Sequence, residues 1–135
     1  DADGAQAWAR ISKSRRAIGA LLMDQTVIAG VGNVYRNELL YRHRIDPYRS
    51  GTHIDEDEFD AMWSDLVELM KVGFRRGKII VVRPEDDHGL PSYAPNRPRT
   101  YVYRRAGEPC RVCGTEVRTA ELEGRNLFWC PTCQK

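Results

Sequence analysis

The four cysteines constrain this chain more than any other feature. They form two pairs, Cys110-x2-Cys113 and Cys130-x2-Cys133, with sixteen residues between the pairs. Each pair places two thiolates on one tight turn, and the intervening length suits a β-hairpin that brings the two turns together. Four thiolates complete the tetrahedral shell of Zn²⁺ and leave no position for water. The spacing therefore predicts one structural zinc ion rather than a catalytic one.

Two other uses of the cysteines must be weighed against zinc. Disulfides are disfavoured because the chain begins Asp1-Ala2-Asp3-Gly4, without the basic and apolar regions of a secretory signal, which indicates a reducing compartment. An iron ion held by four thiolates stays open, since the spacing alone does not distinguish the two metals. A hairpin this small buries little apolar area, so we expect the metal to supply most of its folding energy.

The charged residues are unevenly distributed along the 135 residues, a length that suits one domain or one domain with a small appendage. Residues 1–50 hold eight Lys and Arg against five Asp and Glu, residues 51–96 five against ten, and residues 97–135 eight against four. A fold that joins the two ends would have a basic face suited to nucleic acid, although an ordinary mixed surface explains the counts equally well. Apolar stretches such as 79–82 are too short to span a membrane.

Hydrophobic periodicity predicts three helices. The first runs from Ser14 to Asp24 and the second from Val34 to about Arg42. A third follows the cap residue Asp55 and stops at Gly77. Its apolar residues recur at helical spacing: Phe59, Met62, Trp63, Leu66, Leu69, Met70 and Phe74.

The carboxyl-terminal third reads as loop and strand. Residues 83–98 are rich in Pro and Gly and indicate a long loop. Strands are predicted at 100–104, 115–119 and 126–130, the last two joined by a turn at Glu123-Gly124. The expected fold class is mainly α with a small β: a helical domain over residues 1–99, followed by a zinc-ribbon-like β-hairpin over residues 100–135.

The turn Gly30-Val31-Gly32-Asn33 lies between the first two helices and opens the second. Backbone N–H groups at a helix N-terminus, with Asn33 as a capping side chain, form a site for an anion. We expect that anion to be a DNA phosphate, with Arg36 one turn into the helix assisting. A plain helical hairpin would use its glycines in the same way. A dinucleotide fingerprint does not fit, because no strand precedes the turn.

Arg125 lies at the tip of the predicted zinc hairpin, beside Gly124. A cation on a metal-stiffened turn suits a phosphate contact, because little ordering entropy is lost. Taken alone, an ordinary solvated arginine is the simpler interpretation.

These elements, in this order, resemble the formamidopyrimidine-DNA glycosylase/endonuclease VIII family of base-excision-repair enzymes. The similarity runs from about Arg15 to the end of the chain. The matching text is Leu-Leu-Met-Asp-Gln at 21–25, Gly-Val-Gly-Asn-Val-Tyr at 30–35, Asp-Pro at 46–47, Tyr-Arg-Arg-Ala-Gly-Glu-Pro-Cys-Arg-Val-Cys-Gly-Thr at 103–115 and Cys-Pro-Thr-Cys-Gln-Lys at 130–135.

The resemblance implies a helix-two-turn-helix domain up to about residue 82 and a zinc finger at the tail. It implies that Asn33, in the turn with Gly32, holds a backbone phosphate near the lesion. It also implies that Arg125 contacts the same stretch of backbone, and Tyr103 too, around a flipped nucleotide. The implied partners are damaged double-stranded DNA and an N-terminal catalytic domain of the same protein, in a monomeric, bacterial, cytoplasmic and nucleoid-associated enzyme.

The resemblance also implies that the catalytic residues of the family are not among the residues of this chain. Family members begin with a proline nucleophile followed by a glutamate on a β-rich domain, whereas this chain begins with Asp1. The chain is therefore expected to be the DNA-binding half of a bifunctional DNA glycosylase/AP lyase acting on oxidised bases, with no catalytic residue of its own. The alternative is a free-standing zinc-ribbon nucleic-acid-binding module. No activated amine or triad spacing is evident among the lysines and histidines: Lys13, Lys71, Lys78, Lys135, His43, His53 and His88.

The preference between lesions stays open. Residues 21–25 are closer to the endonuclease VIII branch, which favours oxidised pyrimidines. Residues 107–115 are closer to the formamidopyrimidine branch, which favours oxidised purines.

Overall fold

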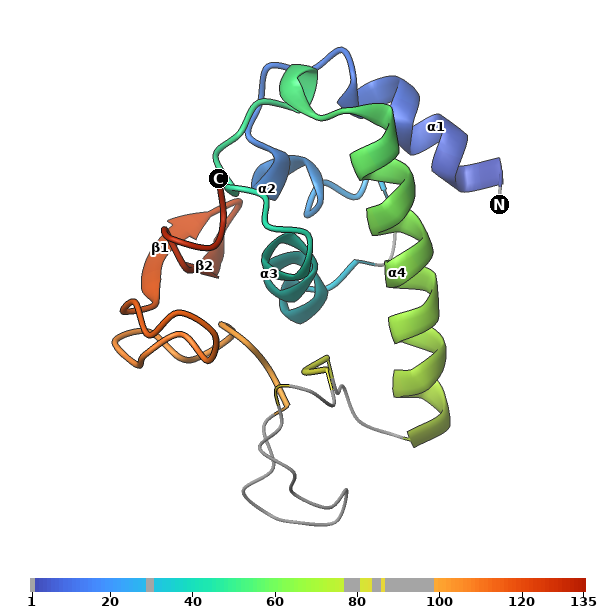
Figure 1. Cartoon of the computed structure of the whole chain (residues 1–135). Helices are drawn as coiled ribbons and strands as arrows, with labels where there is room; N and C mark the ends of the chain where they lie inside the picture. Colours follow the sequence, from blue (N-terminus) through green and yellow to red (C-terminus); the bar gives the residue numbers. More distant parts are fainter. Residues whose placement is uncertain (1, 29–30, 77–80, 84–85, 87–98) are drawn as a thin grey trace.

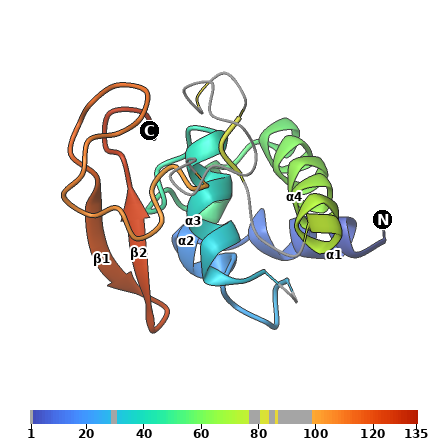
Figure 2. The ribbon, with the colours of Figure 1, turned by 90° about the horizontal axis from the view of Figure 1, so that it is seen from below.

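The computed structural model describes residues 2–28, 31–76, 81–83, 86 and 99–135. Helix α3 occupies the middle of the molecule, with a two-stranded hairpin on one side and the long helix α4 on the other (Figures 1 and 2). The fold is mostly helical with one antiparallel hairpin, as the sequence predicts. In chain order the elements are α1 (Ala2–Ile11), α2 (Ile18–Leu21), α3 (Asn33–Arg42), the 3₁₀ turn η1 (Gly51–His53), α4 (Glu56–Arg76), β1 (Arg118–Leu122) and β2 (Arg125–Trp129).

Helices α1 to α4 share one hydrophobic core. Ile11, Ile18 and Leu40 are fully buried in it. Helix α1 is absent from the sequence prediction, because its ten residues contain few large apolar side chains. It is stabilised by packing on α4, where the Trp8 and Phe59 ring centroids lie 5.4 Å apart. Among the described residues, none of the helices combines the length and the hydrophobicity that a membrane span requires.

The predicted helix over residues 14–24 is wrong in length, since α2 has only four residues. Its apolar side chains are buried as expected, but the surrounding backbone is used differently. The N–H groups of Ile18 and Gly19 donate to the carbonyl oxygens of Arg49 and Pro47 over 2.7 and 2.9 Å. A β-carbon on Gly19 would lie 3.0 Å from that Pro47 oxygen, so glycine permits the close approach. Contact with a distant segment therefore replaces the longer helix.

Helices α3 and α4 lie where the periodicity predicts them. The cap of α3 differs, because Gly32 is the N-cap and Asn33 is already the first helical residue. The expected capping interaction of α4 is present on one side: the Glu58 carboxylate accepts the Asp55 N–H over 2.9 Å. The predicted stop at Gly77 and most of the predicted 83–98 loop lie outside the described residues.

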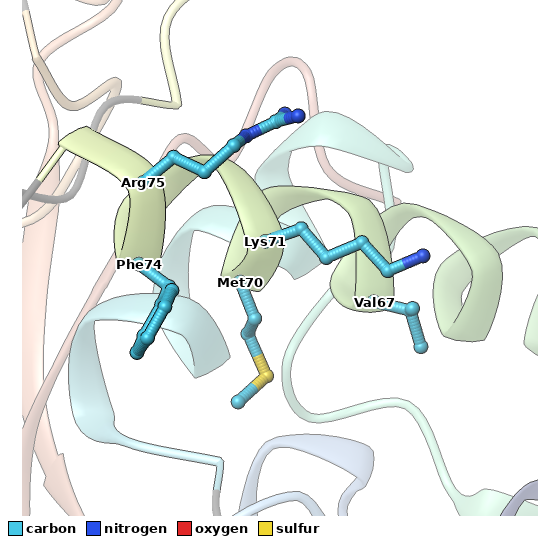
Figure 3. Close-up of a pocket in the computed structure, with 5 residues that line it drawn as sticks. All are labelled: Val67, Met70, Lys71, Phe74 and Arg75. Carbon is cyan, nitrogen blue, oxygen red and sulfur yellow. The ribbon is translucent and has the colours of Figure 1, made fainter.

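The last turns of α4 are more exposed than predicted. Phe74 is 90% exposed and Met70 40% exposed. With Val67 they point to one side of the helix, while Arg75 and Lys71 point elsewhere (Figure 3). The shallow apolar pocket beside them, of about 490 Å³, is lined by residues of α4 alone. Helical spacing predicts which residues share a face, but it does not show how much of that face a neighbour covers.

The predicted hairpin is confirmed, with a shift in its first strand. β1 and β2 pair from Arg118↔Trp129 to Leu122↔Arg125. Glu123 and Gly124 both have positive φ, 56° and 70°, as a two-residue hairpin turn requires. The first strand begins at Arg118 instead of residue 115, because residues 115–117 pair with residues 107–110 on the other side of the first cysteine turn.

The predicted strand at 100–104 is also wrong, and one carboxylate explains why. Glu38 of α3, fully buried, accepts the backbone N–H groups of Tyr101, Val102 and Tyr103, the last two over 2.8 Å each. Three successive N–H groups that converge on one side chain cannot alternate as they do in a strand. Burial raises the pKa of Glu38, although the three N–H donors act to lower it.

A second buried cluster joins the hairpin to the helices. It contains Tyr41 of α3 together with residues that follow α4 in the chain: Val82, Tyr101, Val102, Cys110, Val117, Phe128, Cys130 and Cys133. Helix α3 thus contributes side chains to both cores.

Candidate metal centre and nucleic-acid interface

The four cysteine sulfurs converge on one point. All four Sγ atoms lie within 4.8 Å of one another. Cys110 and Cys133 are 3.8 Å apart, and Cys113 and Cys130 are 3.4 Å apart. Zn–S bonds of about 2.3 Å in a tetrahedron need sulfurs about 3.8 Å apart, and the cysteines form no disulfide. The cluster fits a single four-thiolate zinc ion with a structural role, as predicted.

Local turns hold each pair of cysteines in place. Gly114, with φ of 80°, donates its N–H to the Cys110 carbonyl over 2.9 Å and closes the first turn. In the second turn the Cys133 N–H donates to Cys130 Sγ over 3.4 Å. The hydrogen bond with Thr115 lowers the pKa of the exposed Cys113 thiol to about 6, which favours the thiolate that zinc binds.

A second site lies between the start of α3 and the hairpin tip. We call it the hairpin pocket; its volume is about 310 Å³. Three predicted DNA-binding residues from separate parts of the chain, Asn33, Tyr103 and Arg125, line it together. The full lining is Asn33, Tyr103, Arg104, Gly124, Arg125, Asn126 and Phe128.

The Asn33 side chain is fixed between helix and hairpin. Its Nδ2 donates to the Asn126 carbonyl over 2.9 Å. Its Oδ1 accepts from Arg36 Nη2 over 2.7 Å and from Asn37 Nδ2 over 3.2 Å. The amide therefore stands at the pocket in a set orientation.

The expectation that Arg36 assists at a phosphate is wrong. Its side chain is fully buried, and burial lowers its pKa to about 10, so it stays charged at neutral pH. All five guanidinium N–H donors point at protein oxygens, which leaves none for a phosphate. The acceptors are Asn33 Oδ1 and the carbonyl oxygens of Gly19, Leu122, Arg125 and Asn126. Arg36 instead binds the hairpin to α3, because position 36 faces the hairpin.

Arg125 and Gly32 are both exposed. Arg125 opens β2 at the hairpin tip, and none of the described residues pairs with its guanidinium. Gly32 caps α3 with extended backbone and open space around its α-carbon, but it does not line the hairpin pocket.

Arg104 is a pocket residue that the sequence prediction missed. It is exposed, and its guanidinium carbon lies 5.3 Å from the centroid of the Tyr103 ring. The ring of Tyr103 in turn meets Phe128 edge-on at 5.6 Å. Arg105, the residue after Arg104, is buried and donates to two backbone carbonyls. The sequence Arg-Arg alone therefore did not show which of the two side chains reaches the surface.

Comparison with known proteins agrees with this geometry. A family model described as the formamidopyrimidine-DNA glycosylase H2TH domain matches residues 1–84. The chain belongs to this family. A second model, the zinc finger found in FPG and IleRS, matches residues 107–135 of this H2TH family member and so covers all four cysteines.

The curated relatives of this H2TH chain are longer than it is. Endonuclease 8 1 of Mycobacterium tuberculosis is 80% identical over 134 residues, which cover 99% of this chain and 50% of the relative. The formamidopyrimidine-DNA glycosylase of one Prochlorococcus marinus strain is 36% identical over 131 residues, covering 93% and 42%. The chain thus spans about half the length of the curated relatives it matches.

Solved structures share the fold of this H2TH chain. A Lactococcus lactis FPG mutant in complex with a Fapy-dG containing DNA aligns with a TM-score of 0.74 at 26% identity, over 98% of this chain and 48% of that one. The same organism's Fpg with an abasic site containing DNA aligns equally well at 23% identity, which shows the fold alone.

The lysines and histidines are placed as solvated or structural groups. Lys13, Lys71 and Lys135 are exposed, as is His53. His43 Nε2 lies 2.8 Å from Asp65 Oδ2 in an ion-pair network. Lys78 and His88 lie outside the described residues, and the absence of a catalytic residue stays a prediction.

Proposed function

We propose that this chain is the DNA-binding half of a bifunctional base-excision-repair DNA glycosylase/AP lyase that acts on oxidised bases in duplex DNA. One observation carries the proposal: Asn33, Tyr103 and Arg125, far apart in sequence, line the hairpin pocket, where α3 meets the tip of the β1–β2 hairpin. The 80% identical relatives, named as endonucleases and twice as long, favour this function over a free-standing zinc-ribbon module.

The pocket suits the DNA backbone rather than the bases. Exposed Arg104 and Arg125 offer guanidinium donors, and the fixed Asn33 amide stands beside them. Charge-assisted bonds of this kind hold phosphates and set the position of a duplex without reading its sequence. A backbone gripped at one point helps to hold a nucleotide flipped out of the stack.

The remaining predictions belong to the whole protein. We infer that the nucleophile lies on an N-terminal catalytic domain of a monomeric bacterial enzyme, cytoplasmic and associated with the nucleoid. We also infer the domain division at residues 1–99 and 100–135. The similarity to proteins named endonuclease 8 supports the branch that prefers oxidised pyrimidines, and assays of the full-length protein on both lesion classes decide this.

Replacing the pocket residues tests DNA binding. Asn33→Ala and Arg125→Ala should each weaken binding to duplex DNA bearing an abasic-site analogue by roughly 1–2 kcal/mol, because each removes a phosphate hydrogen bond. Fluorescence anisotropy across a salt series measures this, and wild-type affinity should fall steeply with salt.

Lys71→Ala is the matched control, because it removes one positive charge from α4 instead of the pocket. It should bind duplex DNA within about twofold of wild type, because a substitution far from a site usually acts independently of that site. Normal binding by both pocket variants would contradict the assignment.

Catalysis by the chain alone is tested separately. Incubation with abasic-site DNA and borohydride should trap no covalent adduct, because Lys13, Lys71 and Lys135 are exposed and therefore not activated by desolvation. A trapped adduct would overturn the claim that the nucleophile lies elsewhere, without affecting DNA binding.

A further inference from the structure

One face of α3 connects the hairpin pocket to the zinc cluster. Asn33, Asn37 and Tyr41 recur every fourth residue and therefore lie on the same side of the helix. Each bonds to the zinc-binding segment, residues 107–135, whose hairpin lies beside α3 (Figure 2). Asn37 Oδ1 accepts the Phe128 N–H over 2.7 Å, and Tyr41 Oη lies 3.1 Å from Cys110 Sγ.

The Tyr41 hydroxyl is buried against the metal ligands. The residue is 5% exposed, and its ring stacks on Tyr101 with centroids 4.6 Å apart. Its hydroxyl oxygen is 4.0 Å from Cys133 Sγ as well. Within the described part of the chain, the hydroxyl has no hydrogen-bond partner besides these two sulfurs.

The chemistry of the cluster fixes the direction of this bond. A cysteine that ligates zinc is a thiolate and carries no proton, so in the metal-bound protein the hydroxyl must donate. Four thiolates around one Zn²⁺ leave two negative charges in a largely buried site. Donors that share this charge strengthen metal binding. The other donors to the sulfurs include the Cys133 N–H at Cys130 and the N–H groups of Val112 and Cys113 at Cys110, and they come from the residues around the cysteines themselves.

We propose that Tyr41 is a positioning residue of the zinc centre: its hydroxyl donates to the Cys110 thiolate, tightens zinc binding and fixes the cluster against the end of α3. Eight residues of helix, about 12 Å, separate it from Asn33 at the hairpin pocket. One rigid face of α3 therefore holds the zinc-binding segment at both ends. The proposal concerns metal binding and stands whether or not the DNA-binding proposal holds.

Tyr41→Phe is the test, because it removes one oxygen atom and keeps the ring stack. Tyr101→Phe is its matched control: it removes a hydroxyl from the same stack, but one that bonds to Asp86 and to the Arg83 N–H. Competition with a chromogenic chelator measures zinc affinity. Zinc affinity should fall about tenfold in Tyr41→Phe, the usual effect of removing a hydrogen-bond partner from a metal ligand. It should stay within about twofold in Tyr101→Phe.

Replacing zinc with Co²⁺ makes the hydrogen bond between Tyr41 and Cys110 detectable in the absorption spectrum. A hydrogen bond lowers the energy of the sulfur electrons, so its loss should shift the sulfur-to-Co²⁺ charge-transfer band to longer wavelength in Tyr41→Phe alone. A monofluorinated tyrosine at position 41, a stronger donor of nearly the same shape, should shift the band the other way and serves if Tyr41→Phe does not fold. An unchanged band in these variants, or equal loss of zinc affinity in the Tyr101→Phe control, would overturn the proposal.

Discussion

At the scale of the residue, arginines with similar sequence surroundings have opposite roles. Arg36 is fully buried and binds carbonyl oxygens, whereas Arg125 is exposed at the hairpin tip. Arg105 is buried beside exposed Arg104. An arginine can satisfy its donors with backbone carbonyls or with a ligand phosphate, and only the surrounding structure decides between them.

The adjacent arginines provide a paired prediction. Arg104→Ala should weaken duplex binding about fivefold with little change in stability, because it removes an exposed cation from the hairpin pocket. Arg105→Ala should instead lower the free energy of unfolding by about 2 kcal/mol, since it leaves the carbonyls of Tyr101 and Pro109 without their charged donor. Anisotropy and urea denaturation measure the two effects, and the reverse pattern would refute both roles.

At the scale of the element, α3 and α4 are held together by a charged network as well as by the core. The Asp65 carboxylate of α4 accepts from Arg42 Nε and Nη2 of α3 over 2.8 and 2.9 Å. His43, which caps the C-terminus of α3, meets the same carboxylate. Burial acts to raise the pKa of Asp65, but the hydrogen bonds with His43 and Arg42 outweigh it and hold the pKa well below the usual range.

This network predicts a pH dependence of stability. A carboxyl group with a lowered pKa in the folded state stabilises the fold above its unfolded pKa of about 3.9, and the stabilisation is lost as pH falls toward the folded value. Asp65→Asn should therefore lower the free energy of unfolding by about 2 kcal/mol at pH 7, and the difference from wild type should shrink below about pH 4. Urea denaturation at pH 7, 5 and 3 measures this. Exposed Asp60→Asn on the same helix should show no such trend.

At the scale of the whole molecule, two cores share one helix, and the metal affects them unequally. The helical core involves no cysteine, while three cysteines lie in the second cluster. Because a small zinc hairpin folds with its metal, zinc should be essential to the hairpin and secondary to the helices.

Zinc removal tests this division. A strong chelator, or Cys113→Ser, should unfold the hairpin and abolish duplex binding while most helical circular dichroism remains. Re-addition of zinc should restore the wild-type protein but not the variant. Full DNA binding without metal would show that the hairpin does not need it.

Sequence determined what depends on local spacing. The cysteine pairs predict the metal, the periodicity predicts α3 and α4, and Glu123-Gly124 predicts the hairpin turn. Each follows from residues close together in the chain, whose geometry is fixed by the ligands, the helix repeat or the turn.

Tertiary structure decided what depends on contacts between distant residues. It shortened the predicted 14–24 helix, because the backbone there bonds to the carbonyl oxygens of Pro47 and Arg49. It replaced the predicted 100–104 strand by a turn around Glu38. It also left Phe74 exposed and buried Arg36. It also brought the Tyr41 hydroxyl to the sulfur of Cys110. The physical reason is common to all five: the folded chain decides which partner, if any, each side chain or N–H group meets, and a one-dimensional pattern does not contain that partner.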